Sequence, residues 1–149
     1  MADKKQNWTP SVNFFFQVDF MNKNKGKGIR VSFQEVSGLG WDCNINRRVS
    51  VKGSLGLSYP HLILKRPLGT LNQEFTKWLE LYANCDIYSE DNVHNIVIKL
   101  LDKEGKPVAV WLCTRAYPVQ YRVGDFNAID GKILMETVEL RYERLERKK

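Results

Sequence analysis

The last third of the sequence, Asn92–Leu145, constrains the fold most because its pattern predicts three long antiparallel strands. The run 93–101 is rich in β-branched and aliphatic residues, and the polar turn 102–107 that ends it holds both glycine and proline. The chain then returns through 108–123, where Pro118 is the only interruption. Because proline cannot donate to a strand ladder, we expect an edge, a bend or a bulge at this residue.

The third strand is predicted over residues 133–145, after a longer turn over 124–131. Its period of two is typical of a half-buried strand, so we expect one face in the core and the other against water or a partner. One face consists of Leu134, Val138, Leu140 and Tyr142, and the other of Met135, Thr137, Glu139, Arg141 and Glu143. The carboxylates that we expect to be solvated are Asp125, Asp130, Glu136 and Glu139.

Three more strands are predicted upstream, over residues 11–21, 29–36 and 59–66. The first has a strongly aromatic face, and a turn rich in glycine and lysine leads from it into the second. The residues expected on the buried faces are Val12, Phe14, Phe16, Val18, Phe20, Ile29, Val31, Phe33, Leu62 and Leu64. Together these strands predict a mainly β fold, an antiparallel sandwich or barrel around one core.

One helix is predicted at about residues 70–84, where Thr70 and Gln73 have the spacing of a capping box. An apolar stripe in it repeats every three or four residues, and we expect this stripe to pack on the β body rather than to form a ligand site. The stripe consists of Leu71, Phe75, Trp78, Leu79 and Tyr82, while Glu74, Lys77 and Glu80 face outward.

The segment over about residues 37–58 combines four glycines with large apolar residues. A solvated loop of this length would not normally carry so many apolar side chains. Two interpretations remain open for it. It is either a long hairpin or loop that protrudes from the body and is covered by another subunit, or an ordinary hairpin of the core.

The net charge of +6 comes from basic residues that are concentrated in the first half of the chain but scattered among turns and strand ends. No recognised nucleic-acid motif accompanies them, so we expect no sequence-specific nucleic-acid binding. No apolar run is long enough to span a bilayer, and the polar start of the chain lacks the apolar core of a signal peptide. We therefore expect the chain to be made and folded in the cytoplasm.

The residue types that usually carry chemistry form no recognisable site. Cys43, Cys85 and Cys113 are far apart, which favours reduced core thiols over a disulfide framework. His61 and His94 do not have zinc-ligand spacing with them, and each is expected to cap a strand or face solvent. No phosphate-binding glycine loop or nucleophile elbow is present. We expect no cofactor, no metal and no enzymatic activity.

Several segments, in order, resemble the tail-tube family of contractile phage tails and phage-tail-like contractile injection systems. They are LLDKEGKPVAVW, AYPVQY, DFNA and ETVELRYERL in the last third, preceded by FQEVSGLG at Phe33–Gly40 and YPHLILKR at Tyr59–Arg66. The resemblance spans roughly Phe14–Leu145. The sequence departs from the family at Pro67 and Leu68, where the family more often has glycine directly after the basic pair.

The resemblance implies a single tail-tube domain over residues 1–149, with 1–11 as an N-terminal arm. Such a subunit forms hexameric rings, which stack into a hollow tube around a lumen that can hold cargo. The implied partners are a contractile sheath, baseplate or spike proteins and a tube terminator, in a virion or an injection system. The implied contacts between subunits and rings are Leu39, Trp41, Leu55 and Leu57, with Arg47 and Arg48 at the rim, and the helix residues Glu74, Lys77 and Glu80 are expected to face the sheath.

Other functions remain open from the residues themselves. A tube-initiating paralogue at a baseplate would share the fold but meet different partners. A small-ligand β-barrel would need an internal cavity, against which the many large aromatic residues argue. A basic nucleic-acid binder would bind DNA with strong salt dependence, and an enzyme would need a cleft with converging polar groups.

Overall fold

The computed structural model describes residues 15–22, 28–43, 56–68, 73–84 and 92–149, which form ten strands and one helix. The strands are β1 (Phe15–Met21), β2 (Ile29–Val31), β3 (Glu35–Ser37), β4 (Asp42–Cys43), β5 (Leu57–Ser58), β6 (Leu62–Pro67), β7 (His94–Leu101), β8 (Pro107–Val123), β9 (Met135–Arg141) and β10 (Arg144–Arg147). The helix α1 spans Gln73–Ala83. The predicted mainly β, antiparallel fold with one helix is therefore confirmed.

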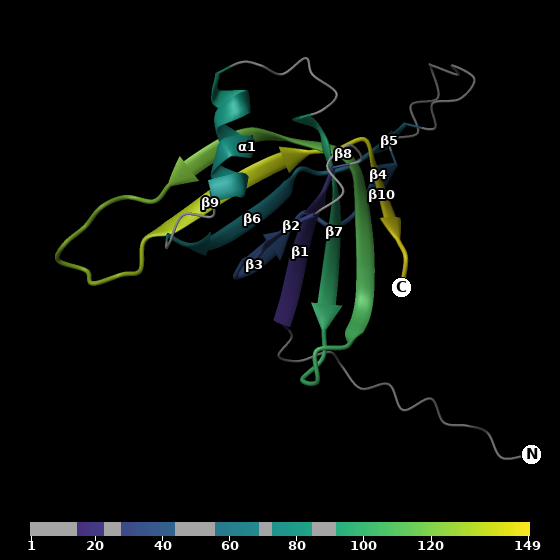
Figure 1. The fold of residues 1–149 in the computed structure, drawn as a ribbon, viewed down its shortest axis with the longest axis horizontal. Coiled ribbons are helices and arrows are strands. Elements are labelled where there is room, and N and C mark those ends of the chain that lie inside the picture. The colour runs from purple at the N-terminus through teal and green to yellow at the C-terminus, as the bar shows by residue number, and fades with distance from the viewer. Residues whose placement is uncertain (1–14, 23–27, 44–55, 69–72, 85–91) are drawn as a thin grey trace, which may run out of the picture.

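Strand β8 is long enough to join two halves of one sheet (Figure 1). Its first part pairs with β7 and with β10, and its second part pairs with β9. The strand order is β2-β1-β7-β8-β9-β6-β3, with β10 beside β8. A register shift between Pro118 and Gln120 confirms the bulge or bend expected at the proline.

The predicted last strand is divided in two. Residues 133–145 were expected to form one continuous strand, but β9 ends at Arg141 and β10 begins at Arg144. The tyrosine between them, Tyr142, is buried and its ring lies 5.6 Å from that of Tyr59. The chain bends here, so that β9 and β10 follow the two differently directed parts of β8 (Figure 1).

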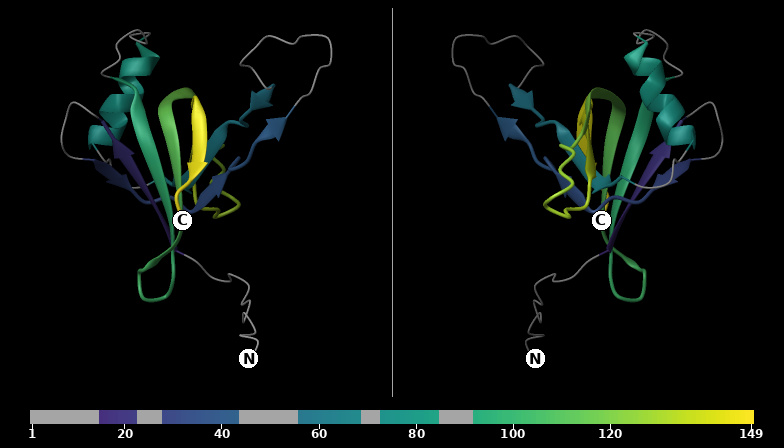
Figure 2. Two further views of the ribbon diagram at one scale, coloured as in Figure 1. Left: turned by 90° about the vertical axis from the view of Figure 1, so that its right-hand side faces the viewer. Right: turned by 90° about the vertical axis from the view of Figure 1, so that its left-hand side faces the viewer.

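The sheet is curled around the core like an incompletely closed barrel (Figure 2). Its end strands β2 and β3 are joined by residues 32–34 alone, so the two ends of the strand order must lie near each other. The largest fully buried side chains are Phe20, Phe75, Leu62, Leu64, Ile96, Leu140, Val18, Val31, Val138 and Cys113. They come from both halves of the sheet and from the helix, so a single core holds these parts together.

Helix α1 closes one side of this core with its aromatic stripe. Trp78 is 3% exposed, and its ring centroid lies 5.2 Å from that of Phe20, which is also 5.2 Å from Phe75. The Trp78 Nε1–H donates a hydrogen bond to the Asn92 carbonyl oxygen over 2.6 Å, so its polar edge is paired as well. The predicted packing of the stripe is confirmed at Phe75 and Trp78, whereas Leu71 lies outside the described residues.

A glycine at the end of β3 is required by the backbone. Gly38 has a φ of +90°, and a Cβ placed there would lie 2.0 Å from the carbonyl oxygen of His61. We expect Gly38→Ala to lower the free energy of unfolding by about 2–3 kcal/mol, because the backbone must leave a left-handed conformation and move off its neighbour. Urea unfolding followed by circular dichroism measures this loss. Gly40→Ala is the matched control, since a Cβ at Gly40 meets nothing within 4 Å, and an equal loss in both variants would contradict the argument.

Candidate interaction surfaces

The β4–β5 hairpin leaves the body as a separate two-stranded sheet (Figure 2). Trp41, directly before β4, is 65% exposed, and Leu57 in β5 is 49% exposed. Leu39, in contrast, is half-buried and packs against the core. The described part of this segment therefore agrees with a protruding hairpin and not with a hairpin of the core. The other residues expected to contact subunits, Arg47, Arg48 and Leu55, lie outside the described residues.

A second apolar projection is the loop 124–134 between β8 and β9, which sequence reasoning treated only as a turn. Phe126, Ile129 and Ile133 are 85%, 93% and 73% exposed. Asn127 shapes the loop, because its side-chain oxygen accepts a hydrogen bond from the Ile129 amide and its amide nitrogen donates one to Asp130, each over 3.0 Å. The sequence contained a signal in Phe126 and Ile129, two large apolar residues in the predicted turn 124–131, whereas Ile133 was expected in the following strand.

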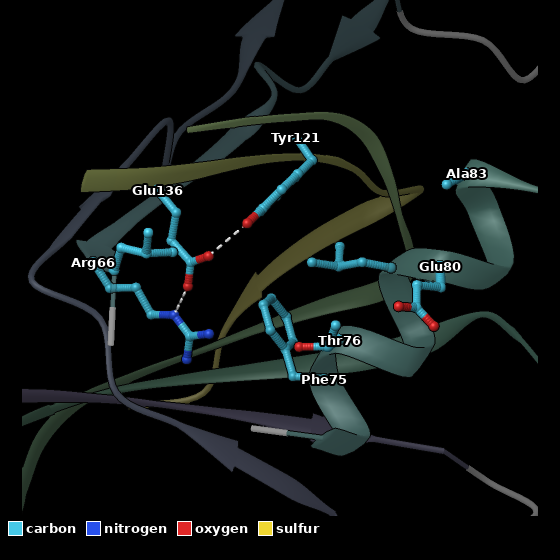
Figure 3. A pocket seen from close by; sticks show the side chains of 9 residues that line it. Arg66, Phe75, Thr76, Glu80, Ala83, Tyr121 and Glu136 are labelled. Carbon is cyan, nitrogen blue, oxygen red and sulfur yellow. Dashed lines mark hydrogen bonds and ion pairs between the residues drawn. The ribbon is translucent and has the colours of Figure 1, made fainter. Parts of the chain in front are cut away.

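The outward face of α1 is polar, as expected. Glu74, Lys77 and Glu80 are all exposed. Beside them, a surface pocket of about 260 Å³ lies between the helix and the second half of β8 (Figure 3). The exposed surface of its lining is mostly apolar, and its polar residues are Arg66, Thr76, Glu80, Tyr121 and Glu136.

The pocket contains an ion pair between Arg66 and Glu136 that the sequence did not predict. Glu136 is 5% exposed, so the expectation that it is solvated is wrong. It accepts hydrogen bonds from Arg66 and from the Tyr121 hydroxyl, the latter over 2.7 Å (Figure 3). The Arg66 guanidinium also lies 5.2 Å from the centroid of the Phe75 ring. Desolvation and the hydrogen bond to the Glu136 carboxylate raise the pKa of Tyr121 to about 12, from an ordinary value of 10 at which the phenol is already protonated at neutral pH.

The other carboxylates of this region lie at the surface. Asp125 and Asp130 are exposed on the loop, as expected. Glu139 is partly buried and pairs with His61, with 2.6 Å between its Oε1 and the Nδ1 of the histidine. His94 is the first residue of β7 and is buried, 5.0 Å from the Trp78 ring, so it lies at the end of a strand but does not face solvent.

Two of the cysteines differ from each other. Cys113 is fully buried, and this burial raises the pKa of its thiol to about 12. Cys43 is exposed on the hairpin, so the expectation of a core thiol is wrong there. Cys85 lies outside the described residues. Among the residues that the structure describes, no three histidines, cysteines or carboxylates are grouped so that they could hold a metal ion.

The outer surface of the sheet carries a charged cluster where β1, β2 and β7 lie side by side. Asp19 pairs with Arg30 at 2.9 Å and with Lys99 at 3.4 Å, and Gln17 donates to it as well. Partial burial alone would raise the pKa of Asp19, but the hydrogen bonds from Arg30, Gln17 and Lys99 outweigh it and lower that pKa below 3.8. The cluster therefore favours the charged carboxylate in the folded chain.

This lowered pKa predicts an acid-dependent loss of stability. The contribution of Asp19 is complete above the ordinary pKa of 3.8 and is lost as the pH falls through the lower, folded-state value. We expect Asp19→Asn to be less stable than the wild type at about pH 6, and the difference to shrink toward about pH 3. Urea unfolding across this range measures it. Glu104→Gln, on an exposed turn, is the control, and a difference for Asp19→Asn that does not change with pH would contradict the assignment.

Free strand edges are a further feature of the surface. Among the described strands, β2 pairs only with β1, and β10 pairs only with β8. Arg144, Glu146 and Lys148 lie along the β10 region and form ion pairs with one another at 3.0 and 2.5 Å. Exposed edges present unpaired backbone groups to any other chain that approaches.

These features define a class of protein: a small curled β-barrel with a filled core, two apolar projections and open sheet edges, which is suited to association with other chains. The sequence matches the family described as T4-like virus tail tube protein gp19 over residues 12–146. Because that match covers nearly the whole chain, the protein belongs to the tail tube protein family, as its resemblance implied. Among curated proteins, none matches the sequence.

Solved structures with the same fold include chains of three differently named proteins and assemblies. A chain of the six-fold symmetrised cryo-EM structure of the anti-feeding prophage (AFP) baseplate is 24% identical, with a TM-score of 0.77 over 94% of this chain and 96% of that chain. A chain of the extended PVC sheath-tube complex, from an extracellular contractile injection system, is 16% identical, with a TM-score of 0.69 over 96% and 93%. Hcp1 from Flavobacterium johnsoniae is 15% identical, with a TM-score of 0.60 over 91% and 95%.

No helix in the described parts of the chain is long and apolar enough to cross a bilayer.

Proposed function

We propose that this protein is the structural subunit of the inner tube of a contractile injection system or phage tail. Six copies form a ring, and the rings stack into a hollow tube. The observation that carries the proposal is the match to the tail tube family over residues 12–146. The structural neighbours support it, because they belong to baseplate, sheath-tube and tube-terminating assemblies of such particles.

Ring formation requires each subunit to cover an edge of its neighbour. In one half of the sheet the strands are ordered β2-β1-β7-β8-β10, so its two outer strands are β2 and β10. When β10 of one copy pairs with β2 of the next, the first copy still has a free β2 edge and the second copy still has a free β10 edge. Such head-to-tail contacts close into a ring when the rotation between copies allows it. The wall of the tube is then a continuous sheet without exposed edges.

Stacking and sheath contacts need other surfaces. The protruding hairpin with Trp41 and Leu57 is our candidate for contact between rings, because its apolar side chains lack cover in a single copy. The exposed face of α1 with Glu74, Lys77 and Glu80 is our candidate for contact with the sheath. The protein acts through assembly and stiffness and turns over no substrate. Assembly takes place in the bacterial cytoplasm, before the tube becomes part of a phage-tail-like particle.

A tube-initiating subunit at the baseplate is the second candidate. It is favoured by the likeness to a chain of the AFP baseplate, which has a TM-score of 0.77. The two functions differ in the length of the assembly. A main tube subunit polymerises into long tubes, whereas an initiator stops after one or a few rings in the absence of its partners.

The test is negative-stain electron microscopy of the purified chain over a range of concentrations, with mass photometry beside it. We expect six-fold rings or hollow tubes in the micrographs. In mass photometry we expect the hexamer to be the most abundant oligomer. Single rings at every concentration would favour the initiator. A chain that stays monomeric at every concentration would contradict the proposed function.

A further inference from the structure

We infer that the loop 124–134 of one copy is the receiving surface for the β4–β5 hairpin of the next copy along the stack. This contact rests on the proposed function and extends it by naming the two surfaces that meet between rings. It assigns a role to a loop that neither the sequence pattern nor the core packing explains.

The two surfaces lie at opposite ends of the molecule. In Figure 1 the loop between β8 and β9 extends from one end of the long axis, and β4 and β5 lie toward the other end. A contact between unlike surfaces at opposite ends repeats without closing, so it generates a stack and not a dimer. The strand edges proposed to close the ring, β2 and β10, belong to the eight-stranded sheet and are part of neither the hairpin nor the loop.

Both surfaces are apolar where a single copy leaves them open. Trp41 and Leu57 on the hairpin are exposed, and so are Phe126, Ile129 and Ile133 on the loop. Isolated exposed apolar residues are common, but two groups of large ones on projecting segments are typical of interaction sites. A contact between the hairpin and the loop would remove the apolar surface of both groups from water, which favours association.

The loop also forms a concave surface that a side chain of another copy could fill. It encloses an open hollow of about 590 Å³, lined by Phe126, Ile133, Leu134 and Met135 together with polar loop residues. A tryptophan is the side chain most typical of an anchor that fills such a hollow at the centre of an interface. We assign this anchor to Trp41.

The charges in the sequence agree with this pairing. By sequence, residues 42–58 contain Arg47, Arg48 and Lys52 against a single Asp42, although of these four only Asp42 lies in the described part of the structure. The loop carries Asp125 and Asp130 against a single Lys132. Opposite charges favour the approach of unlike ends and disfavour contacts between two hairpins.

Disulfide cross-linking between two separately purified variants tests the contact. In a background with Cys43→Ser and Cys85→Ser, one variant carries Ser58→Cys on the hairpin and the other carries Ala128→Cys on the loop; both positions are exposed. The two are mixed under the conditions in which the wild type assembles, oxidised, and separated on a non-reducing gel. The control replaces Ala128→Cys by Lys103→Cys, which is exposed on the turn between β7 and β8.

We expect the mixture of hairpin and loop variants to give at least about ten-fold more cross-linked dimer than the control mixture, because contact raises the effective concentration of the two thiols. Equal yields in both mixtures, from protein that forms stacked rings in the microscope, would overturn the inference and leave the proposed function intact. Absence of any assembly in the wild type would overturn the proposed function and the inference with it.

A second measurement does not depend on introduced thiols. Trp41→Ser and Phe126→Ser are each expected to shorten the tubes to single or few rings in electron micrographs, while the hexamer remains. Val108→Ser is the matched control, because Val108 is also an exposed apolar residue, 40% exposed, but it is the second residue of β8 and belongs to neither the hairpin nor the loop. Long tubes in either test variant would overturn the inference. Short tubes in all three variants would also overturn it, since the effect would not be specific to the two ends.

Discussion

Replacement of Trp78 by alanine is expected to lower the free energy of unfolding by about 3–5 kcal/mol. The indole is 3% exposed and lies between the helix and the sheet, with ring contacts to Phe20 at 5.2 Å and Phe75 at 6.0 Å. The substitution removes these contacts and leaves a cavity that the curled sheet can fill only partly. It also removes the donor that pairs with the Asn92 carbonyl oxygen.

Urea or thermal unfolding of the isolated chain measures this effect. Leu81→Ala, on the same helix but 36% exposed, is the control and is expected to change stability by less than about 1 kcal/mol. The comparison separates loss of packing from a general effect on the helix. If Trp78→Ala costs no more than Leu81→Ala, the helix does not pack on the core as the structure shows.

Replacement of Glu136 by leucine is expected to cost about 3–5 kcal/mol, since it leaves the Arg66 guanidinium in a mostly buried position without its counter-charge. The side chain of Arg66 is only 15% exposed. The Tyr121 hydroxyl loses its acceptor as well. Removal of one member of a buried pair is costly because the other member stays desolvated.

The double variant Arg66→Met/Glu136→Leu distinguishes the loss of a charge partner from a loss of shape. It is expected to recover most of the stability, because no unpaired charge remains in the apolar surroundings. Glu104→Gln, which breaks an exposed pair with Lys106, is the control for surface charge and is expected to cost less than about 1 kcal/mol. A single Glu136→Leu variant as stable as the wild type would show that the pair is not buried in solution.

The strands and the helix were predictable because their signals are local. The alternation along residues 135–141 predicted that Val138 and Leu140 are buried, and the stripe around Phe75 and Trp78 predicted the packed face of the helix. Pro118 predicted an irregularity because a missing amide affects any ladder in which the residue stands. Each of these inferences needs only the backbone geometry of its own segment.

The environment of a side chain that meets a distant segment was not predictable. Glu136 lies on the strand face that the alternation assigns to the core, but a glutamate side chain is usually solvated. Only the approach of Arg66, 70 residues away in sequence, makes its burial favourable. His94 is likewise buried because Trp78 packs against it. Apolar residues in the turn over 124–131 gave no sign of whether the core would cover them.

The sequence by itself determined that antiparallel strands and one packed helix build the fold, which apolar residues of the first and last strands and of the helix face the core, and the family resemblance that the comparison confirmed. Only the tertiary structure decided that Leu39 joins the core while Trp41 projects from it, and that the two apolar projections lie at opposite ends. The physical reason is that periodicity reports which side of a segment avoids water, whereas the curl of the sheet decides how far the core extends and which apolar side chains remain outside it.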